Sequence, residues 1–586
     1  MLELNGLKNV EKPARYIGGE KGAAYKNVEQ NLNIAICVPR LYEEVMLNTS
    51  SSSSWLKQMY WYLNKKSNVY CQRVFAIDKD FEKVLLSNNE KLCTLEQYTY
   101  LKDMDIIIAC IDDVMEYTSF LNVLKNAGIP MLSSRRKSEF PYIILTGDAV
   151  YNPYPMSQFV DAYIYGNSIA VMDNILLKYN WWKRQKTDKY KFLKDISDTT
   201  GVFVPDLSYA KKYEDNLDSK IFMATYEDLD NEITPNIEII PNMKTEQDNI
   251  GISLCRGCLK NCTNCARRYI YGQANFLSYK NAIKKIDIAT KYTGISDVGV
   301  YSNCYAIYDK FYDLVKEVKT LIGPNIRNIY LGDIALNTDN LWLLDYLKLY
   351  PSRYNYIPRI IVGGATYKQR RFLGLDLTDD QVKKIAEKVY SKEYPYVILD
   401  CTIGIPGETK EDMLNIVTLA NNIANSFEKI CCKLPERQAV LLRIRGFRAT
   451  SHTPSQYASV NDSKQILEKQ EFLRIANDNP YVSFAFENPY MHEVRQLLMR
   501  GGEDVASILH TVAKQGASVE YIDSNFAEPL WRDAIIKSGI DLKALCLEKP
   551  LDYIFPWDNI LVSTSKGLIK EEYIKMKDYI KFRRVG

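Results

Sequence analysis

Residues 254–268 have the sequence LCRGCLKNCTNCARR, and this stretch decides how the rest of the chain is interpreted. It holds four of the thirteen cysteines, with the spacing C-x₂-C-x₃-C-x₂-C: Cys255, Cys258, Cys262 and Cys265. Four thiols so close together, on a loop with turn-forming residues, can converge on a soft metal centre. The spacing therefore predicts a metal site in this loop.

Clustered cysteines also occur in disulfide-bonded, zinc-binding and electron-carrying proteins. Nothing in the chain suggests secretion, which argues against disulfides. A structural zinc favours two well-separated pairs or added histidines, whereas the histidines of this chain lie far downstream, at His452, His492 and His510. An iron–sulfur cluster that only carries electrons stays open at this point, because Cys255 is available as a fourth ligand.

Length and composition bound the fold class. The 586 residues are too many for one core and favour about three domains. With 46% hydrophobic and 25% charged residues, the composition is typical of a globular protein. The 75 basic and 72 acidic residues nearly cancel, so nucleic acid is not indicated as a partner. The absence of a signal peptide and of an apolar run of roughly 18 residues predicts a cytoplasmic location and no membrane contact.

Apolar runs alternate with helical patterns in the first part of the chain. The expected strands are 32–38, 72–76, 105–110, 142–146 and 162–165, with helices at 55–63, 81–87 and 116–127 between some of them. This alternation predicts βαβ units in a Rossmann-like, doubly wound domain over residues 31–175, after a lead-in at 1–30. Its turns contain no G-x-G-x-x-G motif.

A second alternation begins after a predicted linker at 176–248. Strands are expected at 252–254, 298–301, 328–331, 359–362, 397–402 and 439–444, with helices between them. Six β/α repeats predict a partial (β/α)6 barrel over 249–458, with the cysteine loop at the carboxyl-end face. Residues 459–586 are expected to form a mixed, mostly helical C-terminal region.

The turn after the fifth barrel strand is the second motif with chemical meaning. It comprises Gly404, Ile405, Pro406, Gly407 and Glu408, followed by Thr409. Two glycines allow the backbone to approach a small molecule closely, and the helix start beyond them favours a negative group. An ordinary β-to-α turn accounts for the same residues equally well when they are taken alone.

The chain resembles radical SAM proteins with an N-terminal cobalamin-binding-like domain, and most closely a bacterial subfamily of that group. The resemblance is carried by the order and spacing of nine segments: KPARYIGGE (Lys12–Glu20), RVFA (Arg73–Ala76), NVLKNAGIP (Asn122–Pro130), YNPYPMSQFVDAYIYG (Tyr151–Gly166), CRGCLKNC (Cys255–Cys262), IGIPGET (Ile403–Thr409), SHTPSQY (Ser451–Tyr457), MRGGEDV (Met499–Val505) and FPWD (Phe555–Asp558).

The resemblance implies a cofactor set and the residues that hold it. Cys258, Cys262 and Cys265 would bind a [4Fe–4S] cluster, and the segment Gly404–Glu408 would border S-adenosylmethionine (SAM), which the cluster cleaves reductively. Cobalamin, if bound, would lie between the N-terminal sheet and the barrel mouth. Tyr301 and Asn303 are further candidates for cofactor binding. Arg256, Asp333, Arg443, Arg445, Arg448 and His452 are candidates for substrate binding at the barrel mouth.

Several positions depart from the pattern of these relatives. The D-x-H-x-x-G loop is missing and the first domain has no histidine. A histidine ligand to cobalt from this domain is therefore impossible, and two alternatives stay open: cobalamin binds without a protein ligand, or the domain binds no cobalamin. Asp148 and Asn167 stand in turns where the relatives carry glycine-rich and acidic segments, and Asn264 stands where they carry an aromatic residue. Gly363-Gly364-Ala365 replaces a glutamate-containing segment.

The expected function is a cobalamin-dependent radical SAM methyltransferase that acts on an unactivated carbon. The first alternative is a cobalamin-free radical SAM enzyme that performs rearrangement, oxidation or sulfur insertion. If such an enzyme has an auxiliary cluster, the pair Cys431-Cys432 is a candidate for its ligands. The second is a non-catalytic, regulatory iron–sulfur protein. The enzyme is expected to be a monomer, with an electron donor such as ferredoxin or flavodoxin as its partner. The sequence does not identify the substrate.

Overall fold

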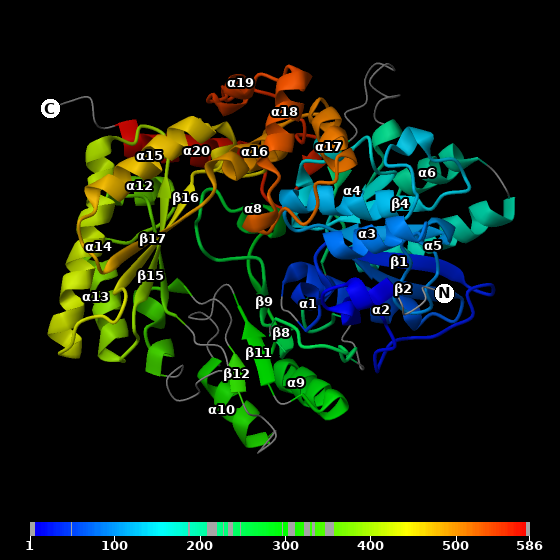
Figure 1. The fold of residues 1–586 in the computed structure, drawn as a ribbon, viewed down its shortest axis with the longest axis horizontal. Helices are drawn as coiled ribbons and strands as arrows, with labels where there is room; N and C mark the ends of the chain where they lie inside the picture. The colour runs from blue at the N-terminus through cyan, green and yellow to red at the C-terminus, as the bar shows by residue number, and fades with distance from the viewer. Residues whose placement is uncertain are drawn as a thin grey trace.

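The fold is that of a computed structural model. It describes residues 6–47, 50–185, 188–207, 220–226, 228–232, 238–246, 248–295, 297–302, 311–321, 328–330, 335–345 and 357–581. Figure 1 shows two sheet-containing halves, one built around β1–β5 and one around β14–β17, with a group of C-terminal helices spanning both.

The N-terminal half is organised by a six-stranded sheet in the order β2-β1-β3-β4-β5-β6. Its strands are β1 (Leu32–Val38), β2 (Val69–Phe75), β3 (Ile106–Cys110), β4 (Tyr142–Thr146), β5 (Ala162–Ile164) and β6 (Val202–Phe203). The first five pair in parallel, whereas β6 is antiparallel to β5. The predicted doubly wound sheet is confirmed. The order 2-1-3-4-5 places the topological switch point between β1 and β3, where ligands of such sheets bind.

Helices cover both faces of this sheet, which explains why its strands are continuous apolar runs. On one face, Ile34, Ile36 and Ile108 share a core with α2 (Ser51–Asn64) and α5 (Ser168–Gln185). On the other, Cys37, Ile107 and Ala109 share a core with α4 (Tyr117–Asn126) and α17 (Val505–Lys514). The remaining helices of this half are α1 (Tyr42–Val45), α3 (Lys79–Ser87) and α6 (Lys189–Ser197).

The segment that the sequence predicts as a linker takes part in the fold. Its first residues form the end of α5, α6 and the edge strand β6. A later piece, β7 (Ile221–Phe222), pairs with β18 (Ile560–Leu561) from the C-terminal region. The sequence did not indicate these strands because β6 and β7 are only two residues long each, too short to produce a hydrophobic period.

The second half contains eight parallel strands in two described sheets. The first sheet has the order β12-β11-β8, and the second has the order β13-β14-β15-β16-β17. Their bounds are β8 (Ile250–Ser253), β11 (Asp297–Tyr301), β12 (Asn328–Tyr330), β13 (Ala335–Leu336), β14 (Arg359–Gly363), β15 (Val397–Ile403), β16 (Val440–Gly446) and β17 (Val482–Phe486). Strands and helices alternate as predicted, but β17 extends the sheet into the region expected to be mostly helical.

In β15 and β16 buried and accessible residues alternate along the strand. The buried side chains, such as Leu399 and Leu442, share a core with α13 (Asp379–Ser391) and α14 (Lys410–Cys431). The opposite side chains therefore point to the inner side of the curved sheet. Helices α9 (Tyr279–Thr293), α10 (Phe311–Leu321) and α12 (Tyr367–Phe372) complete this half.

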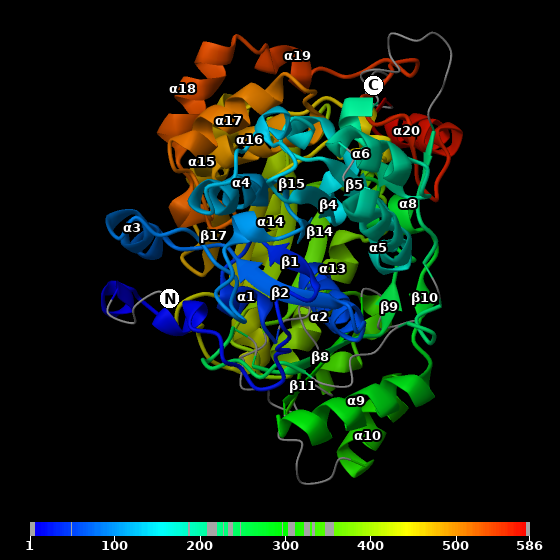
Figure 2. The ribbon, with the colours of Figure 1, turned by 90° about the vertical axis from the view of Figure 1, so that its right-hand side faces the viewer.

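The C-terminal helices lie above both halves in Figure 1. They are α15 (Ser463–Ala476), α16 (Pro489–Arg500), α17, α18 (Glu528–Ser538), α19 (Leu542–Cys546) and α20 (Lys566–Lys581). In Figure 2, which views the N-terminal side, the N-terminal sheet lies in front of β14 and β15. No helix in the described part of the chain is long and apolar enough to cross a membrane.

Candidate metal and cofactor site

The cysteine loop is an excursion closed at its base by a short antiparallel ladder. In that ladder β9 (Cys255–Arg256) pairs with β10 (Asn275–Phe276). Gly257 leaves the ladder with φ +78°, and a Cβ there would lie 2.8 Å from the carbonyl oxygen of Gln273. Only glycine fits this position without strain. The loop then passes the three remaining cysteines and enters α8 (Ala266–Tyr271), for which Cys265 is the N-cap residue.

Buried hydrogen bonds hold the middle of the loop against the barrel. The Thr263 hydroxyl donates to the carbonyl oxygen of Phe372 at 2.8 Å, and the Thr263 carbonyl accepts from the Ser455 amide at 3.2 Å. The backbone of Gly374 passes so close that a Cβ there would meet the Asn261 oxygen at 1.8 Å. These contacts fix the middle of the loop, at Asn261 and Thr263, against the barrel.

Cys258, Cys262 and Cys265 are partly buried on this loop. Burial, and then the negative charge of Cys265 and Cys258, raise the pKa of the Cys262 thiol to about 11. The three thiols are thus close enough to influence one another. Nevertheless, no three Cys, His, Asp or Glu side chains of the described residues already form a metal-binding group. The thiol donors fit an iron–sulfur cluster in number and type, but the loop does not gather them around one centre.

Cys255 differs from the other three. It is buried in β9, at 7% exposure, and its Sγ lies 3.3 Å from the Ser302 hydroxyl. Cys255 therefore lies in the ladder at the base of the loop, whereas the other three cysteines lie in the part of the loop that extends beyond this ladder. This placement favours a structural role for Cys255 over a role as a fourth cluster ligand.

The glycine-rich turn follows β15 at the carboxyl end of the second sheet. Gly404 and Gly407 both have φ +77°. A Cβ at Gly404 would lie 2.7 Å from Asn461 Oδ1, whereas nothing lies within 4 Å of a Cβ at Gly407. Ile405 is buried in the same apolar core as Tyr269 and Ile270 of α8. The open backbone at Gly407 is the part of the turn that a ligand can approach.

Glu408 faces the protein interior. Its Oε2 accepts hydrogen bonds from the Gly404 amide at 2.7 Å and from Lys469 Nζ at 2.8 Å, and its side chain has no exposed surface. Burial raises the pKa of Glu408, and Lys469 opposes that shift. Through these hydrogen bonds Glu408 stabilises the conformation of the turn. A direct contact with SAM stays a prediction.

The other predicted residues are spread over the barrel mouth and beyond. Tyr301 ends β11 and lines the cavity described next, whereas Asn303 and Asp333 lie outside the described residues. His452 is fully enclosed, with Nε2 at 3.0 Å from the Tyr151 carbonyl oxygen, and burial lowers its pKa to about 4. The structure thus places His452 among the buried residues of the protein interior.

A cavity of about 770 Å³ lies between the two halves. One wall comes from the carboxyl end of the N-terminal sheet, including Asp112 and Asp148. The facing wall comes from the cysteine loop and the first barrel strands, including Cys255, Arg256 and Tyr301. The volume is in the range of small-molecule sites. None of the described residues that line it is a histidine.

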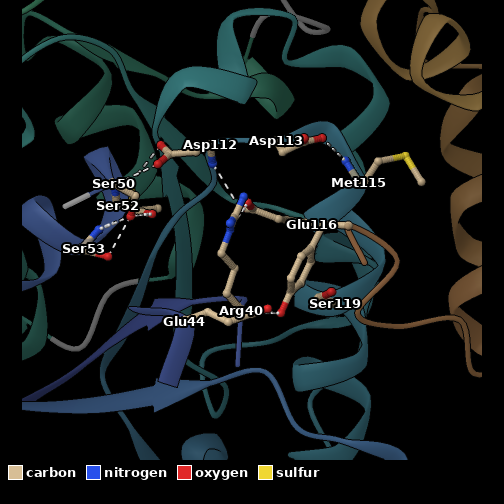
Figure 3. Close-up of polar contacts among 12 residues, drawn as sticks. Arg40, Glu44, Ser50, Ser52, Ser53, Asp112, Asp113, Met115, Glu116 and Ser119 are labelled. Carbon is tan, nitrogen blue, oxygen red and sulfur yellow. Dashed lines mark hydrogen bonds and ion pairs between the residues drawn. The ribbon is translucent and has the colours of Figure 1, made fainter. Parts of the chain in front are cut away.

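The switch point of the N-terminal sheet carries a buried network of charges, shown in Figure 3. Asp112 accepts from the Ser52 amide at the start of α2 at 2.8 Å, and its own amide donates to Glu116 at 3.1 Å. Glu116 in turn accepts from Arg40 Nε at 2.6 Å. Burial raises the pKa of Glu116 to about 8, and the Arg40 charge opposes that shift. These contacts hold the Asp112 carboxylate at the cavity wall.

Asp148 connects the N-terminal sheet directly to the cysteine loop. It accepts a hydrogen bond from the Tyr271 hydroxyl and lies 3.7 Å from Arg267, both on α8. On the same wall, Arg256 pairs with Glu232 and stacks over Tyr226 at 4.2 Å. The charges of this wall are therefore mostly compensated within the protein.

Sequence reasoning missed some of these residues. Tyr226 and Glu232 lie in the predicted linker and carry no motif. Lys469 and Thr263 act through contacts that are distant in the sequence. Asp112, by contrast, was anticipated by its position after the predicted strand 105–110, because ligands of such sheets bind beyond the carboxyl ends of the strands.

Comparison with known proteins identifies the family of the N-terminal half. Residues 56–205 match the family model described as "Radical SAM proteins, N-terminal". This part of the chain is the N-terminal domain of a radical SAM protein. Radical SAM proteins use SAM and an iron–sulfur cluster, in agreement with the predicted role of the cysteine loop.

Two curated proteins are similar to part of the chain. Both are named tRNA-2-methylthio-N(6)-dimethylallyladenosine synthase, from Delftia acidovorans (strain DSM 14801 / SPH-1) and Acidovorax sp. (strain JS42). Each is 26% identical over 235 residues, which is 35% of this chain and 48% or 47% of the relative. The chain thus spans about half the length of the curated relatives it matches.

Among solved structures, the cobalamin-dependent S-adenosylmethionine radical enzyme OxsB is similar at a low level. Its structure with aqua-cobalamin and S-adenosylmethionine bound has a TM-score of 0.44 and 11% sequence identity, and the match covers 94% of this chain and 79% of that chain. Its form with aqua-cobalamin alone also has a TM-score of 0.44, with 81% of that chain covered.

Proposed function

We propose that this protein is a radical SAM enzyme that methylates an unactivated carbon with the help of cobalamin. The observation that carries the proposal is the cysteine loop, fixed at the barrel mouth and opposite a cavity at the switch point of a radical SAM N-terminal domain. When bound, the cluster with SAM would supply reductive cleavage of SAM, and cobalamin would supply methyl transfer.

The residues of the chain would hold and shield these groups. Cys258, Cys262 and Cys265 would supply three thiolates, which leaves one iron of a four-iron cluster for SAM. Thr263 would keep the loop in place through its buried hydrogen bonds. The open backbone at Gly407 would accept SAM, while Lys469 and Glu408 keep the turn in shape. An electron donor such as ferredoxin or flavodoxin would reduce the cluster.

The cavity walls fit an amide-rich ligand such as cobalamin. Hydroxyl and amide side chains gather on the N-terminal wall, at Ser50, Ser51, Ser54, Asn167 and Ser168. Asp148, which would burden a bound corrin with an unpaired charge, is compensated by Arg267 and Tyr271. Because no histidine is among the described residues that line the cavity, the cobalt would have no imidazole ligand from these walls.

Anaerobic purification and cluster reconstitution test the radical SAM part. The wild-type protein is expected to hold about four irons per chain and to release 5′-deoxyadenosine from SAM and a reductant. Cys258→Ala should remain folded and lose both, while the exposed Cys432→Ala serves as the matched control. An unchanged iron content in Cys258→Ala, or no 5′-deoxyadenosine from a loaded wild-type protein, would contradict the proposal. Unfolding of Cys258→Ala would instead point to a structural cluster.

Cobalamin binding is tested separately, without turnover. Wild-type protein incubated with hydroxocobalamin and freed of excess should retain the characteristic absorbance. Ser54→Trp, which fills the N-terminal wall of the cavity, should reduce that retention, whereas the same change at the exposed Ser87, at the end of α3 and not among the residues that line the cavity, should leave it unchanged. No retention by the wild type would refute methyl transfer by this route and leave the cluster chemistry in place.

A second candidate is a cobalamin-free radical SAM enzyme that inserts sulfur. The names of the two curated relatives favour it. Cys431 and Cys432, the pair that bears on an auxiliary cluster, lie at the end of α14. That helix has 22 residues and starts beside the glycine turn, so the pair lies about 33 Å further along the helix. About eight irons per chain would support this candidate, and about four would oppose it.

A further inference from the structure

The inner side of the β15–β16 pair carries two layers of polar side chains. The register pairs Asp400 with Arg443 in one layer, and Thr402 with Arg445 in the next layer toward the carboxyl end. Ile444, between the two arginines, is buried in the core with the outer helices. Both arginines therefore point to the inner side, and Arg445 is the one nearer to the glycine turn that follows β15.

Arg443 is neutralised within its own layer. Its Nε and Nη2 donate to the two carboxylate oxygens of Asp400 at 2.5 and 2.8 Å. Arg359 on β14 lies 3.2 Å from the same carboxylate. This two-pronged geometry is the strong form of an arginine–carboxylate pair. Asp400 thus already pairs with two arginines.

Arg448 is neutralised by Glu487, at the end of β17. Glu487 pairs with Arg448, accepts from the Gly446 amide at 3.3 Å and lies 3.9 Å from Arg495 Nε. Burial works to raise the pKa of Glu487, but Arg448 and His492 outweigh it and lower the pKa to about 2. The second carboxylate of this region is therefore also occupied.

Arg445 has no such partner. Its side chain is exposed to the inner side of the sheet, and no ion pair or hydrogen bond joins it to any residue that the structure describes. Burial of part of the side chain and the charges of Arg443 and Arg448 lower its pKa. A guanidinium placed beside two other arginines, with both nearby carboxylates paired to those arginines, is available to bind an anion from outside.

We propose that Arg445 is the anion-binding residue of the barrel interior, and that it takes a carboxylate or phosphate group of a bound small molecule. The group has two possible sources, the carboxylate of SAM or an acidic group on the substrate. The first source rests on the proposed function, whereas the anion site itself does not. Of Arg443, Arg445 and Arg448, only Arg445 is left for a ligand.

The chain offers a matched control on the same strand. Arg437 precedes β16 and is exposed. It lies eight residues before Arg445, near the amino end of the strand. Arg437→Gln therefore makes the same change of charge away from the barrel mouth, and Arg445→Lys keeps the charge without the planar fork.

The first arm uses inorganic phosphate as the probe on the full chain without cluster or SAM. Phosphate should raise the melting temperature of the wild type and of Arg437→Gln, and the apparent affinity should fall about 10- to 100-fold in Arg445→Gln. Arg445→Lys should lie between them. Because this arm needs no cluster, it can succeed even if the proposed function fails.

The second arm measures binding of SAM and of decarboxylated SAM to the reconstituted protein. If Arg445 binds the SAM carboxylate, the wild type should prefer SAM about 10- to 100-fold, and Arg445→Gln should lose that preference. If the anion belongs to the substrate, both ligands should bind Arg445→Gln as they bind the wild type, while the phosphate response is lost. Equal behaviour of Arg445→Gln and Arg437→Gln in both arms would overturn the inference.

Discussion

The contact between Gly374 and the cysteine loop predicts that one added methyl group will remove the cluster. Gly374 follows α12 in a left-handed conformation, with φ +74°. A Cβ there would lie 1.8 Å from the Asn261 oxygen and 3.2 Å from the Cys262 Cα. Gly294 follows α9 with φ +71°, and a Cβ there would meet nothing within 4 Å. The two glycines share the backbone strain and differ only in the clash.

The two variants are expected to lose different amounts of folding free energy. Alanine in the left-handed region costs about 1–2 kcal/mol at either position. In Gly374→Ala the new carbon and the Asn261 oxygen must also separate to at least 3.0 Å, a shift of about 1.2 Å. Such overpacking adds about 1–3 kcal/mol. The displacement is several times the tolerance of about 0.2 Å in metal–ligand distances, and it acts directly next to Cys262.

The assay measures iron per chain after anaerobic reconstitution, together with urea unfolding. Gly294→Ala should lose about 1–2 kcal/mol of the free energy of unfolding and keep its iron. Gly374→Ala should lose about 2–5 kcal/mol and most of its iron. A Gly374→Ala protein that binds as much iron as Gly294→Ala would refute the reasoning, because it would show that the loop position at Asn261 does not control the cluster.

Three further predictions concern single side chains of the site and its surroundings. Cys255→Ala should keep about four irons per chain, because Cys255 lies in the base ladder of the loop; an iron content near zero would make it a ligand. Lys469→Met should cost about 3 kcal/mol in urea unfolding at pH 8 by leaving Glu408 buried without a counter-charge. This cost should be smaller at pH 5 than at pH 8, because burial raises the pKa of Glu408 and favours the neutral carboxyl group as the pH falls; equal costs at both pH values would contradict this. The pKa of His452 is about 4 in the folded protein and about 6.5 when unfolded, so the unfolded chain binds more protons between these values. The stability from neutral His452 is complete above pH 6.5 and is lost as the pH falls toward 4, about 3 kcal/mol in all; urea unfolding of His452→Gln should show a correspondingly weaker pH dependence.

The N-terminal sheet could be predicted from the sequence because both of its faces are covered. Strands β1 and β4 coincide with the predicted ranges 32–38 and 142–146, since every residue in them is buried. Strand β17 was missed for the opposite reason. In VSFAF (Val482–Phe486) the inner-side residues Ser483 and Ala485 are small or polar, so the run lacks the apolar signal of a central strand and lies among strong helical patterns.

The sequence indicated a metal site in the cysteine loop because all four cysteines lie close together in the sequence. The roles of the arginines were not indicated, because they depend on the register between strands far apart in the chain. Asp400 and Arg443 face each other only because β15 and β16 align Val397 with Val440. A shift by one residue would turn all these side chains to the outer face, and sequence alone does not specify which alignment forms.

The contacts of α8 couple the cavity to the cysteine loop. This helix starts at its N-cap residue Cys265 and ends at Tyr271, which donates to Asp148 on the N-terminal sheet. Six helical residues span only about 9 Å and behave as one rigid piece. On its other side, Tyr269 donates to Glu572 of α20 at 2.6 Å, so the C-terminal helix fixes α8 laterally. A ligand that displaces Asp148 from Tyr271 would therefore act on the position of Cys265. Asp148 on the cavity wall and Cys265 on the cysteine loop are thus joined through one short helix, although they come from opposite halves of the molecule.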